Sequence, residues 1–319
     1  MPAADRQHSP VADGILVVDK PAGWTSHDVV ARVRRLAGTR KVGHAGTLDP
    51  MATGVLILGL NRATRLLTYM FGADKEYLAT IRLGAATSTD DADGEPVIDP
   101  RLGGGDASAL TAGNVLAGVA ALTGAIQQVP SSVSAVKVAG ERAHDRVRSG
   151  QDVQLPARAV IVREFVILDQ RHVDGFLDLD VRVGCSSGTY VRALARDLGR
   201  ALRDPGGRAV GGHLTALRRT RVGAIGLAQA SRLDTLIEQV ERGGALPLRS
   251  MADAASAFVP VRHVSEQEVL DLRHGRMLQP TGRAGAVAAV GPAGQLCAIL
   301  RDDRKRGSQV AAPQIVLAQ

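Results

Sequence analysis

Aromatic side chains are scarce in this sequence: phenylalanine, tryptophan and tyrosine together make up only 3% of its 319 residues. A sheet that stacks RNA bases on several exposed aromatics, as in the RRM fold, is therefore not expected.

Long apolar segments are also missing, because no apolar run approaches the roughly 18 residues that a membrane span needs. Residues 1–12 lack the apolar core of a signal peptide, so we expect a disordered leader and a cytoplasmic protein.

Cysteine is also rare, because Cys185 and Cys297 are the only two in the chain. Their separation excludes a disulfide framework and a zinc-binding spacing, and favours two reduced, buried thiols. The eight histidines form no H-x-x-x-H pair, so no metal site is expected. A phosphate loop ending in G-K-[ST] and a G-x-S-x-G nucleophile elbow are both missing.

Positive charge is in excess, with a net charge of +7 and a pI of about 10.0. Such a balance indicates a polyanionic partner, chiefly nucleic acid. Only five of the 39 basic residues are lysine. An arginine bias of this kind can also reflect genome composition, so charge alone leaves both explanations open.

Short apolar runs alternate with helical patterns through the first 250 residues. A buried strand is predicted at 14–19, followed by a helix at 27–37 that Ser26 caps and Gly38 ends. The other predicted elements are strands at 55–60, 76–83, 176–184 and 217–222 and helices at 62–71, 113–123, 189–202 and 231–242. Strands and helices do not alternate as regular βαβ units, which favours an α+β fold with a mixed sheet.

The pattern changes after about residue 250. Short apolar runs separated by Gly and Pro predict a small C-terminal β-barrel domain. These runs are 258–261, 286–290, 296–300 and 315–318.

One aspartate stands out because three glycines surround it on a turn-rich loop, Gly43–Gly54, ahead of an apolar strand. Glycine lets a second chain approach the backbone closely, and Pro50 keeps Asp49 out of helical geometry. An aspartate held in this way can be a nucleophile or a base, and it can equally cap the turn. Spacing alone does not decide between these roles.

The loop resembles the active-site motif of the TruB family, the bacterial tRNA pseudouridine-55 synthases. Further segments match other motifs of this family in the family's order: Leu16–Gly23, Asp74–Tyr77, Thr89–Gly94, Pro130–Lys137, Gly188–Arg192 and Leu217–Arg219. The family usually has a tyrosine at the position of Val133, so the packing of that segment is in doubt. Beyond residue 250 the chain is similar to the PUA-like barrel that often ends this family.

The resemblance implies a reaction and the residues that carry it out. Asp49 is then the nucleophile that attacks the ribose or the base of the target uridine, whose uracil detaches, rotates and rejoins through C5. Tyr77 would stack on the base and accept the C5 proton, and Arg192 would pair with Asp49 and keep it ionised. An isomerisation of this kind needs no metal, nucleotide or redox cofactor.

Other residues acquire supporting roles from the same resemblance. Tyr190 and Leu217 would enclose the base, His44 would fill the gap left in the RNA stack, and Lys20 would support the cluster. Asp90 has two possible roles, an RNA contact or a turn cap.

The resemblance also implies a domain organisation and a partner. Residues 13–249 would form the catalytic domain, with an RNA-binding insert at about 126–155, and residues 250–319 the PUA-like domain. The expected partner is the T-arm loop of tRNA, bound by a monomer. A guide-dependent synthase of the same fold and a non-catalytic RNA-binding protein are the two alternatives.

Overall fold

The computed structural model describes residues 11–131, 137–138, 141–142, 155–305 and 307–318. Most of the predicted leader and most of the predicted insert, including Val133, lie outside these residues. The chain divides into two compact units, Met1–Ala73 with Arg221–Gln319, and Asp74–Thr220. Within the described residues, no helix is both long and apolar enough to cross a membrane.

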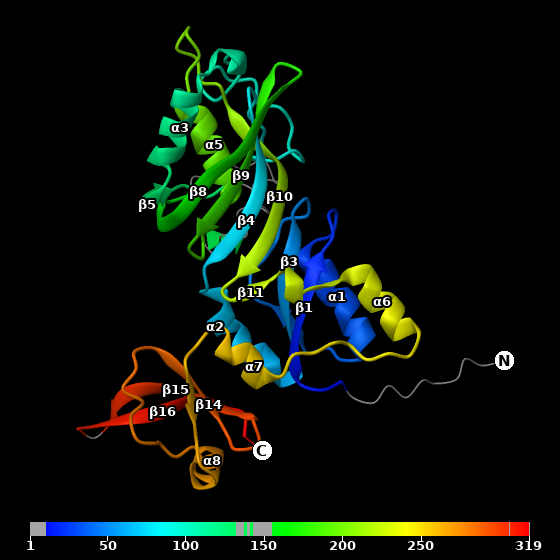
Figure 1. The fold of residues 1–319 in the computed structure, drawn as a ribbon, viewed down its shortest axis with the longest axis vertical. Coiled ribbons are helices and arrows are strands. Elements are labelled where there is room, and N and C mark those ends of the chain that lie inside the picture. The colour runs from blue at the N-terminus through cyan, green and yellow to red at the C-terminus, as the bar shows by residue number, and fades with distance from the viewer. Residues whose placement is uncertain (1–10, 132–136, 139–140, 143–154, 306, 319) are drawn as a thin grey trace, which may run out of the picture. The chain divides into compact units, whose positions relative to one another are not determined.

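The first unit is built on a small sheet near the N-terminus (Figure 1). Strand β1 (Gly14–Lys20) pairs antiparallel with β3 (Thr53–Leu60), whose other neighbour here is the short strand β2 (Val42–His44). The two-residue strand β12 (Ser231–Arg232) runs parallel to β1. Helices α1 (Ser26–Ala37) and α6 (Leu233–Glu241) lie side by side next to β1. The sheet is therefore mixed, as predicted.

Helix α1 begins one residue earlier than predicted and has a different cap. Thr25, not Ser26, is the N-cap, and it exchanges hydrogen bonds with Asp28 in a capping box. Gly38 ends the helix with φ 60°, as predicted. The prediction for Ser26 was wrong because its hydroxyl is fully buried and bonded elsewhere.

The C-terminal part of the first unit is a four-stranded sheet in the order β13-β14-β15-β16. Its elements are β13 (Val261–His263), α8 (Glu266–Arg273), β14 (Ala286–Val290), β15 (Leu296–Lys305) and β16 (Ser308–Val316). The predicted strands are present, but the described strands form an open sheet and not the expected closed barrel. The short helix α7 (Met251–Ser256) precedes them.

One apolar core joins this sheet to the N-terminal strands of the same unit. Ile15 and Ile57 belong to the same buried cluster as Ala288, Leu296 and Ile299. At the edge of this core, Arg62 donates to the carbonyl of Leu317 at 3.1 Å and Arg65 to that of Val316 at 2.9 Å.

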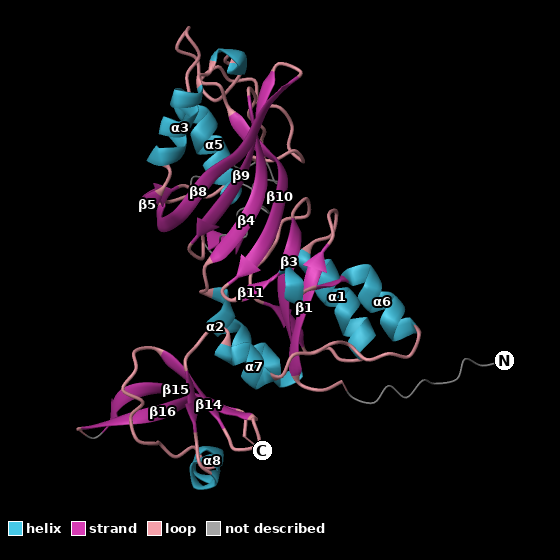
Figure 2. Ribbon diagram, viewed as in Figure 1, coloured by secondary structure: helices cyan, strands magenta, loops and turns pink. Residues whose placement is uncertain are grey.

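The second unit is a sheet covered by helices (Figure 2). Its strands follow the order β10-β4-β9-β8-β5. The bounds are β4 (Lys75–Leu83), β5 (Gly124–Gln128), β8 (Arg158–Val173), β9 (Phe176–Cys185) and β10 (Gly212–Val222), with helices α3 (Ala112–Ala121) and α5 (Val191–Ala201). A two-stranded ribbon, β6 (Lys137–Val138) with β7 (Glu141–Arg142), completes the unit.

Helix α5 lies very close to the start of β10. A Cβ atom on Gly199 would come within 2.1 Å of the carbonyl carbon of Gly211, so only glycine permits this approach. This contact fixes the helix that carries Arg192 against the sheet.

The predicted elements of the second unit are present, but two strands of its sheet, β5 and β8, were not expected, and residues 126–128 of the predicted insert belong to β5. The 16-residue strand β8 was not predicted, because its outward face exposes Ile161, Val166 and Leu168 and its second half is polar.

In the first unit, the predicted helix at 62–71 is a 3₁₀ turn, η1 (Asn61–Leu66), followed by the one-turn helix α2 (Leu67–Phe71).

Candidate active site

The loop that carries Asp49 is anchored on the residue before the aspartate. The amide of Leu48 donates to Ser26 Oγ at 2.8 Å, and the same hydroxyl donates to the carbonyl of Leu48 at 3.1 Å. Ser26 is fully buried at the start of α1. A single side chain thus satisfies both backbone groups of Leu48, and Asp49 follows at a half-buried position.

Lys20 anchors the residue after the aspartate. It is fully buried at the end of β1. Its Nζ donates to the carbonyls of Pro21 at 3.0 Å, Trp24 at 2.6 Å and Pro50 at 3.1 Å. An ammonium group has three donors, so these bonds compensate its loss of water. The carbonyl of Pro50 also accepts from the amide of Gly23 at 2.9 Å.

These contacts make the Asp49 loop a rigid platform. Leu48 and Pro50, the two neighbours of Asp49, are both tied to the β1–α1 turn, and the amide of Ala52 bonds back to the carbonyl of Asp49 at 3.1 Å. The backbone on both sides of Asp49 is therefore held in place, as the positioning of a reacting side chain requires.

His44 lies at the end of β2, opposite Leu58 of β3. Its ring meets the ring of His27 edge-on, with centroids 5.5 Å apart and planes at 86°. His27 comes from the first turn of α1. Two imidazoles therefore meet within the first unit.

Tyr77 and Leu217 occupy neighbouring strands of the second unit. Tyr77 lies on the buried face of β4 opposite Val183, with 8% of its surface exposed, and Leu217 of β10 is 7% exposed. Lys75 shares the Tyr77 face, because side chains two residues apart point the same way along a strand. Burial, reinforced by the nearby Arg219, lowers the pKa of Lys75 to about 8.

The backbone of Tyr190 is held from both sides by one glutamine. Its amide donates to Gln128 Oε1 at 2.8 Å, and Gln128 Nε2 donates to its carbonyl at 3.1 Å. Gln128 ends β5 and is almost fully buried. The half-buried Tyr190 is thereby fixed at the N-cap of α5.

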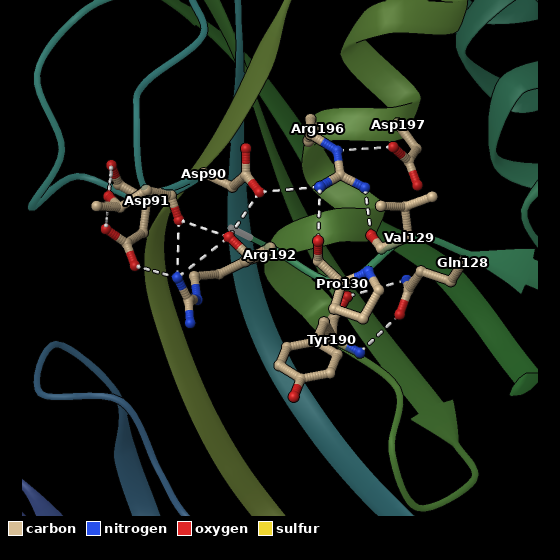
Figure 3. A network of polar contacts seen from close by, with 11 residues as sticks. Asp90, Asp91, Gln128, Val129, Pro130, Tyr190, Arg192, Arg196 and Asp197 are labelled. Carbon is tan, nitrogen blue, oxygen red and sulfur yellow. Dashed lines mark hydrogen bonds and ion pairs between the residues drawn. The ribbon is translucent and has the colours of Figure 1, made fainter. Parts of the chain in front are cut away.

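Arg192 follows two residues later and belongs to a buried polar network (Figure 3). Its Nη1 donates to the carbonyl of Thr89 at 2.8 Å and to Ser131 Oγ at 3.3 Å. The same nitrogen lies 3.5 Å from Asp91 Oδ2, in an ion pair whose side chains are 5% and 6% exposed. Asp91 also accepts from the amide of Asp93 at 3.2 Å.

Asp90, next to Asp91, points toward a different arginine. Its Oδ2 lies 3.2 Å from Arg196 Nη1, and the residue is 7% exposed. Burial raises the pKa of the Asp90 carboxyl, and the opposing charge of Arg196 works against that rise.

The predicted site residues fall into two groups. Lys20, His44 and Asp49 lie in the first unit, and Lys20 contacts the Asp49 loop directly. Tyr77, Asp90, Tyr190, Arg192 and Leu217 lie in the second unit. The expected pairing of Asp49 with Arg192 joins the two units and stays a prediction.

Several positioning residues were not singled out from the sequence. Ser26 was assigned to a helix cap, and Asp91, Gln128, Ser131 and Arg196 received no individual role. Arg196 could have been found from the sequence, because it follows Arg192 by four residues and therefore lies on the same, apolar side of α5.

The described residues contain no group of three or more His, Cys, Asp or Glu side chains that could hold a metal ion.

The fold is that of the pseudouridylate synthases. A chain of a Cbf5–Nop10–Gar1 complex matches with a TM-score of 0.68 and 25% identity, over 95% of this chain and 84% of that one. A chain of an H/ACA ribonucleoprotein bound to a substrate RNA containing 2′-deoxyuridine matches with a TM-score of 0.69 and 24% identity, over 96% and 85%.

Sequence comparison narrows this class to one family. Residues 34–191 match the model of the TruB family pseudouridylate synthase N-terminal domain, and residues 240–312 match that of the tRNA pseudouridine synthase II C-terminal domain. A protein of Leifsonia xyli named tRNA pseudouridine synthase B is 54% identical over 91% of this chain and 93% of its own. A protein of Thermobifida fusca with the same name is 52% identical over 97% and 99%. The chain belongs to the TruB family.

Proposed function

We propose that this protein converts uridine 55 in the T-arm loop of tRNA into pseudouridine, with Asp49 as the nucleophile. The observation that carries the proposal is the identity of 52–54%, over more than nine-tenths of the chain, to proteins named tRNA pseudouridine synthase B. The doubly anchored Asp49 loop supports the choice of nucleophile, because a reacting carboxylate must be held in a fixed geometry.

The reaction is a rearrangement within one nucleotide. Asp49 attacks the ribose or the base, the bond between N1 and C1′ breaks, and uracil rotates. A new bond then forms between C5 and C1′, the bond to Asp49 breaks and returns the free carboxylate, C5 loses its proton and N1 gains one. Atoms and electrons balance, so the step needs no redox partner.

The base must leave the RNA stack before Asp49 can reach it, which costs a few kcal/mol. In the proposed complex Tyr77 stacks on the base and accepts the C5 proton, and Tyr190 and Leu217 form the walls. Stacking on an aromatic ring returns about 1–3 kcal/mol per base. Arg192 faces Asp49 and keeps the carboxylate ionised, an effect that a dry pocket strengthens. His44 takes the place of the flipped base.

Tritium release tests the reaction and the nucleophile together. Pseudouridine formation releases the hydrogen of C5, so a tRNA transcript labelled there is incubated with the wild type and with Asp49→Asn. We expect release by the wild type alone, from the T-loop uridine, and equal tRNA binding by both proteins. Full activity in Asp49→Asn would disprove the assignment of the nucleophile.

The C-terminal sheet is proposed to act as a PUA-like RNA-binding domain within residues 250–319, beside a catalytic domain of residues 13–249. The match of residues 240–312 to the C-terminal family model supports it. In this proposal the domain grips the acceptor end of tRNA, and the protein acts as a cytoplasmic monomer. Replacing the exposed Arg304 and Lys305 of β15 by alanine should then weaken tRNA binding without disturbing the shared core, and light scattering should give the mass of one chain.

A guide-dependent reaction is the second candidate, since two structural neighbours come from complexes of the Cbf5 and H/ACA type. The much higher identity to tRNA pseudouridine synthase B proteins favours the standalone reaction. Activity of the purified protein on unmodified tRNA, with no added RNA or protein, separates the two.

A further inference from the structure

Arg196 is a buried arginine that the proposed reaction does not use. It lies one helical turn after Arg192 on α5 and is 7% exposed. Its Nη2 donates to the carbonyl of Val129 at 2.6 Å, its Nη1 lies 3.2 Å from Asp90 Oδ2, and its Nε pairs with Asp197 at 2.8 Å. A guanidinium so far from water is stable only because each edge has an acceptor.

Asp90, its main partner, has an unusual backbone. Its φ of 61° lies in the left-handed region, which non-glycine residues other than Asn and Asp rarely adopt. Asp90 N donates to Thr87 O at 3.3 Å, and Asp90 O accepts from Leu214 N at 3.1 Å. The turn therefore fixes both the Asp90 side chain and the preceding carbonyl of Thr89.

Ser131 connects this pair to Arg192, and Figure 3 shows Asp90, Arg192 and Arg196 in the same network. Its hydroxyl donates to Asp90 Oδ2 at 2.7 Å and accepts from Arg192 Nη1 at 3.3 Å. The residue is fully buried. The Thr89 carbonyl, which the Asp90 turn orients, accepts from the same Arg192 nitrogen at 2.8 Å. Arg192 thus receives two of its contacts from groups that Asp90 and its turn hold, and Arg196 in turn pairs with Asp90.

We propose that Asp90, Ser131 and Arg196 are positioning residues that set the guanidinium of Arg192 for the reaction. This inference rests on the proposed function, in which Arg192 faces the nucleophile. It gives Asp90 a role in place of an RNA contact, since its carboxylate is directed into the protein toward Arg196. It also explains why a second arginine is buried on α5, where an apolar side chain would pack without needing acceptors.

Single-turnover tritium release with enzyme in excess tests the proposal, together with the Kd for tRNA and the free energy of unfolding. Ser131→Ala removes the hydroxyl with no change in charge, and Asp90→Asn keeps an oxygen acceptor and tolerates the left-handed backbone. We expect both to lower the single-turnover rate constant about 10-fold to 100-fold, since small displacements of reacting groups have effects of this size. The Kd for tRNA should not change.

Asp178→Asn is the matched control. Asp178 is as buried as Asp90 and pairs with Arg82 through two hydrogen bonds, of 2.7 and 2.8 Å, in the same unit but outside the network of Arg192. It should lower the free energy of unfolding and leave the rate constant unchanged. If Ser131→Ala and Asp90→Asn behave in the same way as this control, the three residues are only structural and the proposal is overturned.

A double-substitution cycle shows whether the effect passes through Arg192. In an Arg192→Lys background, Ser131→Ala should cost little further rate, because the group it positions has already been lost. Additive losses would overturn the route through Arg192. If the wild type itself released no tritium, the proposed function would fail, and the same cycle measured on the free energy of unfolding would still decide whether Ser131 and Arg192 are coupled.

Discussion

Ser26 and Leu48, 22 residues apart in the sequence, share two hydrogen bonds through a single hydroxyl. The serine lies at the first turn of α1, and the leucine immediately precedes Asp49. The position of the proposed nucleophile therefore depends on a helix that contributes no reacting group of its own.

Ser26→Ala should lower the free energy of unfolding by about 2–3 kcal/mol, because it leaves the buried amide and carbonyl of Leu48 without their partner. Chemical denaturation measures this, and single-turnover tritium release should show a slower reaction. Ser108→Ala is the control, since Ser108 is exposed and should change stability by less than about 0.5 kcal/mol. Equal effects of the two substitutions would contradict the role given to Ser26.

Lys20→Met should cost about 3 kcal/mol of unfolding free energy, because it deprives the carbonyls of Pro21, Trp24 and Pro50 of their shared, fully buried donor. The Asp49 loop should also become more mobile, which hydrogen exchange at Ala52 would detect. Lys41→Met serves for comparison, as Lys41 is exposed. An unchanged exchange rate at Ala52 would show that Lys20 does not hold the loop.

Stability should rise with pH above neutrality because of Lys75. Its pKa is about 8 in the folded protein and 10.5 as a free side chain, so the unfolded chain binds more protons between these values. From pH 7.5 to 9 the gain from this group is about 1 kcal/mol at the usual 1.36 kcal/mol per pKa unit. Urea unfolding at both pH values should show the gain in the wild type and its loss in Lys75→Met. A rise of the same size in Lys75→Met would assign the effect to another group.

Ile299→Ala should destabilise the first unit by about 2–5 kcal/mol, the usual cost of removing a buried isoleucine side chain. Ile299 of β15 is 1% exposed and shares its core with Ile15 and Ile57. We expect the N-terminal strands and the C-terminal sheet to unfold together, which hydrogen exchange can follow in both. Ile98→Ala, at a position 99% exposed, should have almost no effect. Separate unfolding of the C-terminal sheet would contradict a shared core.

The sequence predicted the elements whose burial is regular and local. Strands β4 and β9 and helix α1 have clear periodicity, β1 is a short continuous apolar run, and all four were identified. Strand β8 was missed because the periodicity rule assumes one polar face, whereas β8 exposes Leu168 and Val166. The closed C-terminal barrel was expected from spaced apolar runs, which an open sheet produces equally well.

Sequence motifs identified residues of the candidate site but not the contacts that hold these residues in place. They singled out Asp49 and Arg192 but not what holds them. Ser26 contacts the loop across 22 residues, and Thr89 contacts Arg192 across 103. Such pairings depend on the tertiary fold, and no local pattern encodes them. The same limit explains why the two roles of Asp90 could not be separated from the sequence.

The clamps on Leu48 and Pro50 determine when the Asp49 loop becomes ordered. Because Ser26 and Lys20 belong to the folded protein, the conformational entropy of this loop, about 1–2 kcal/mol per residue of backbone, is lost once, during folding. It is not lost again in each encounter with tRNA. In the proposed reaction, the interaction energy of each encounter is therefore available for extracting the uridine from its stack.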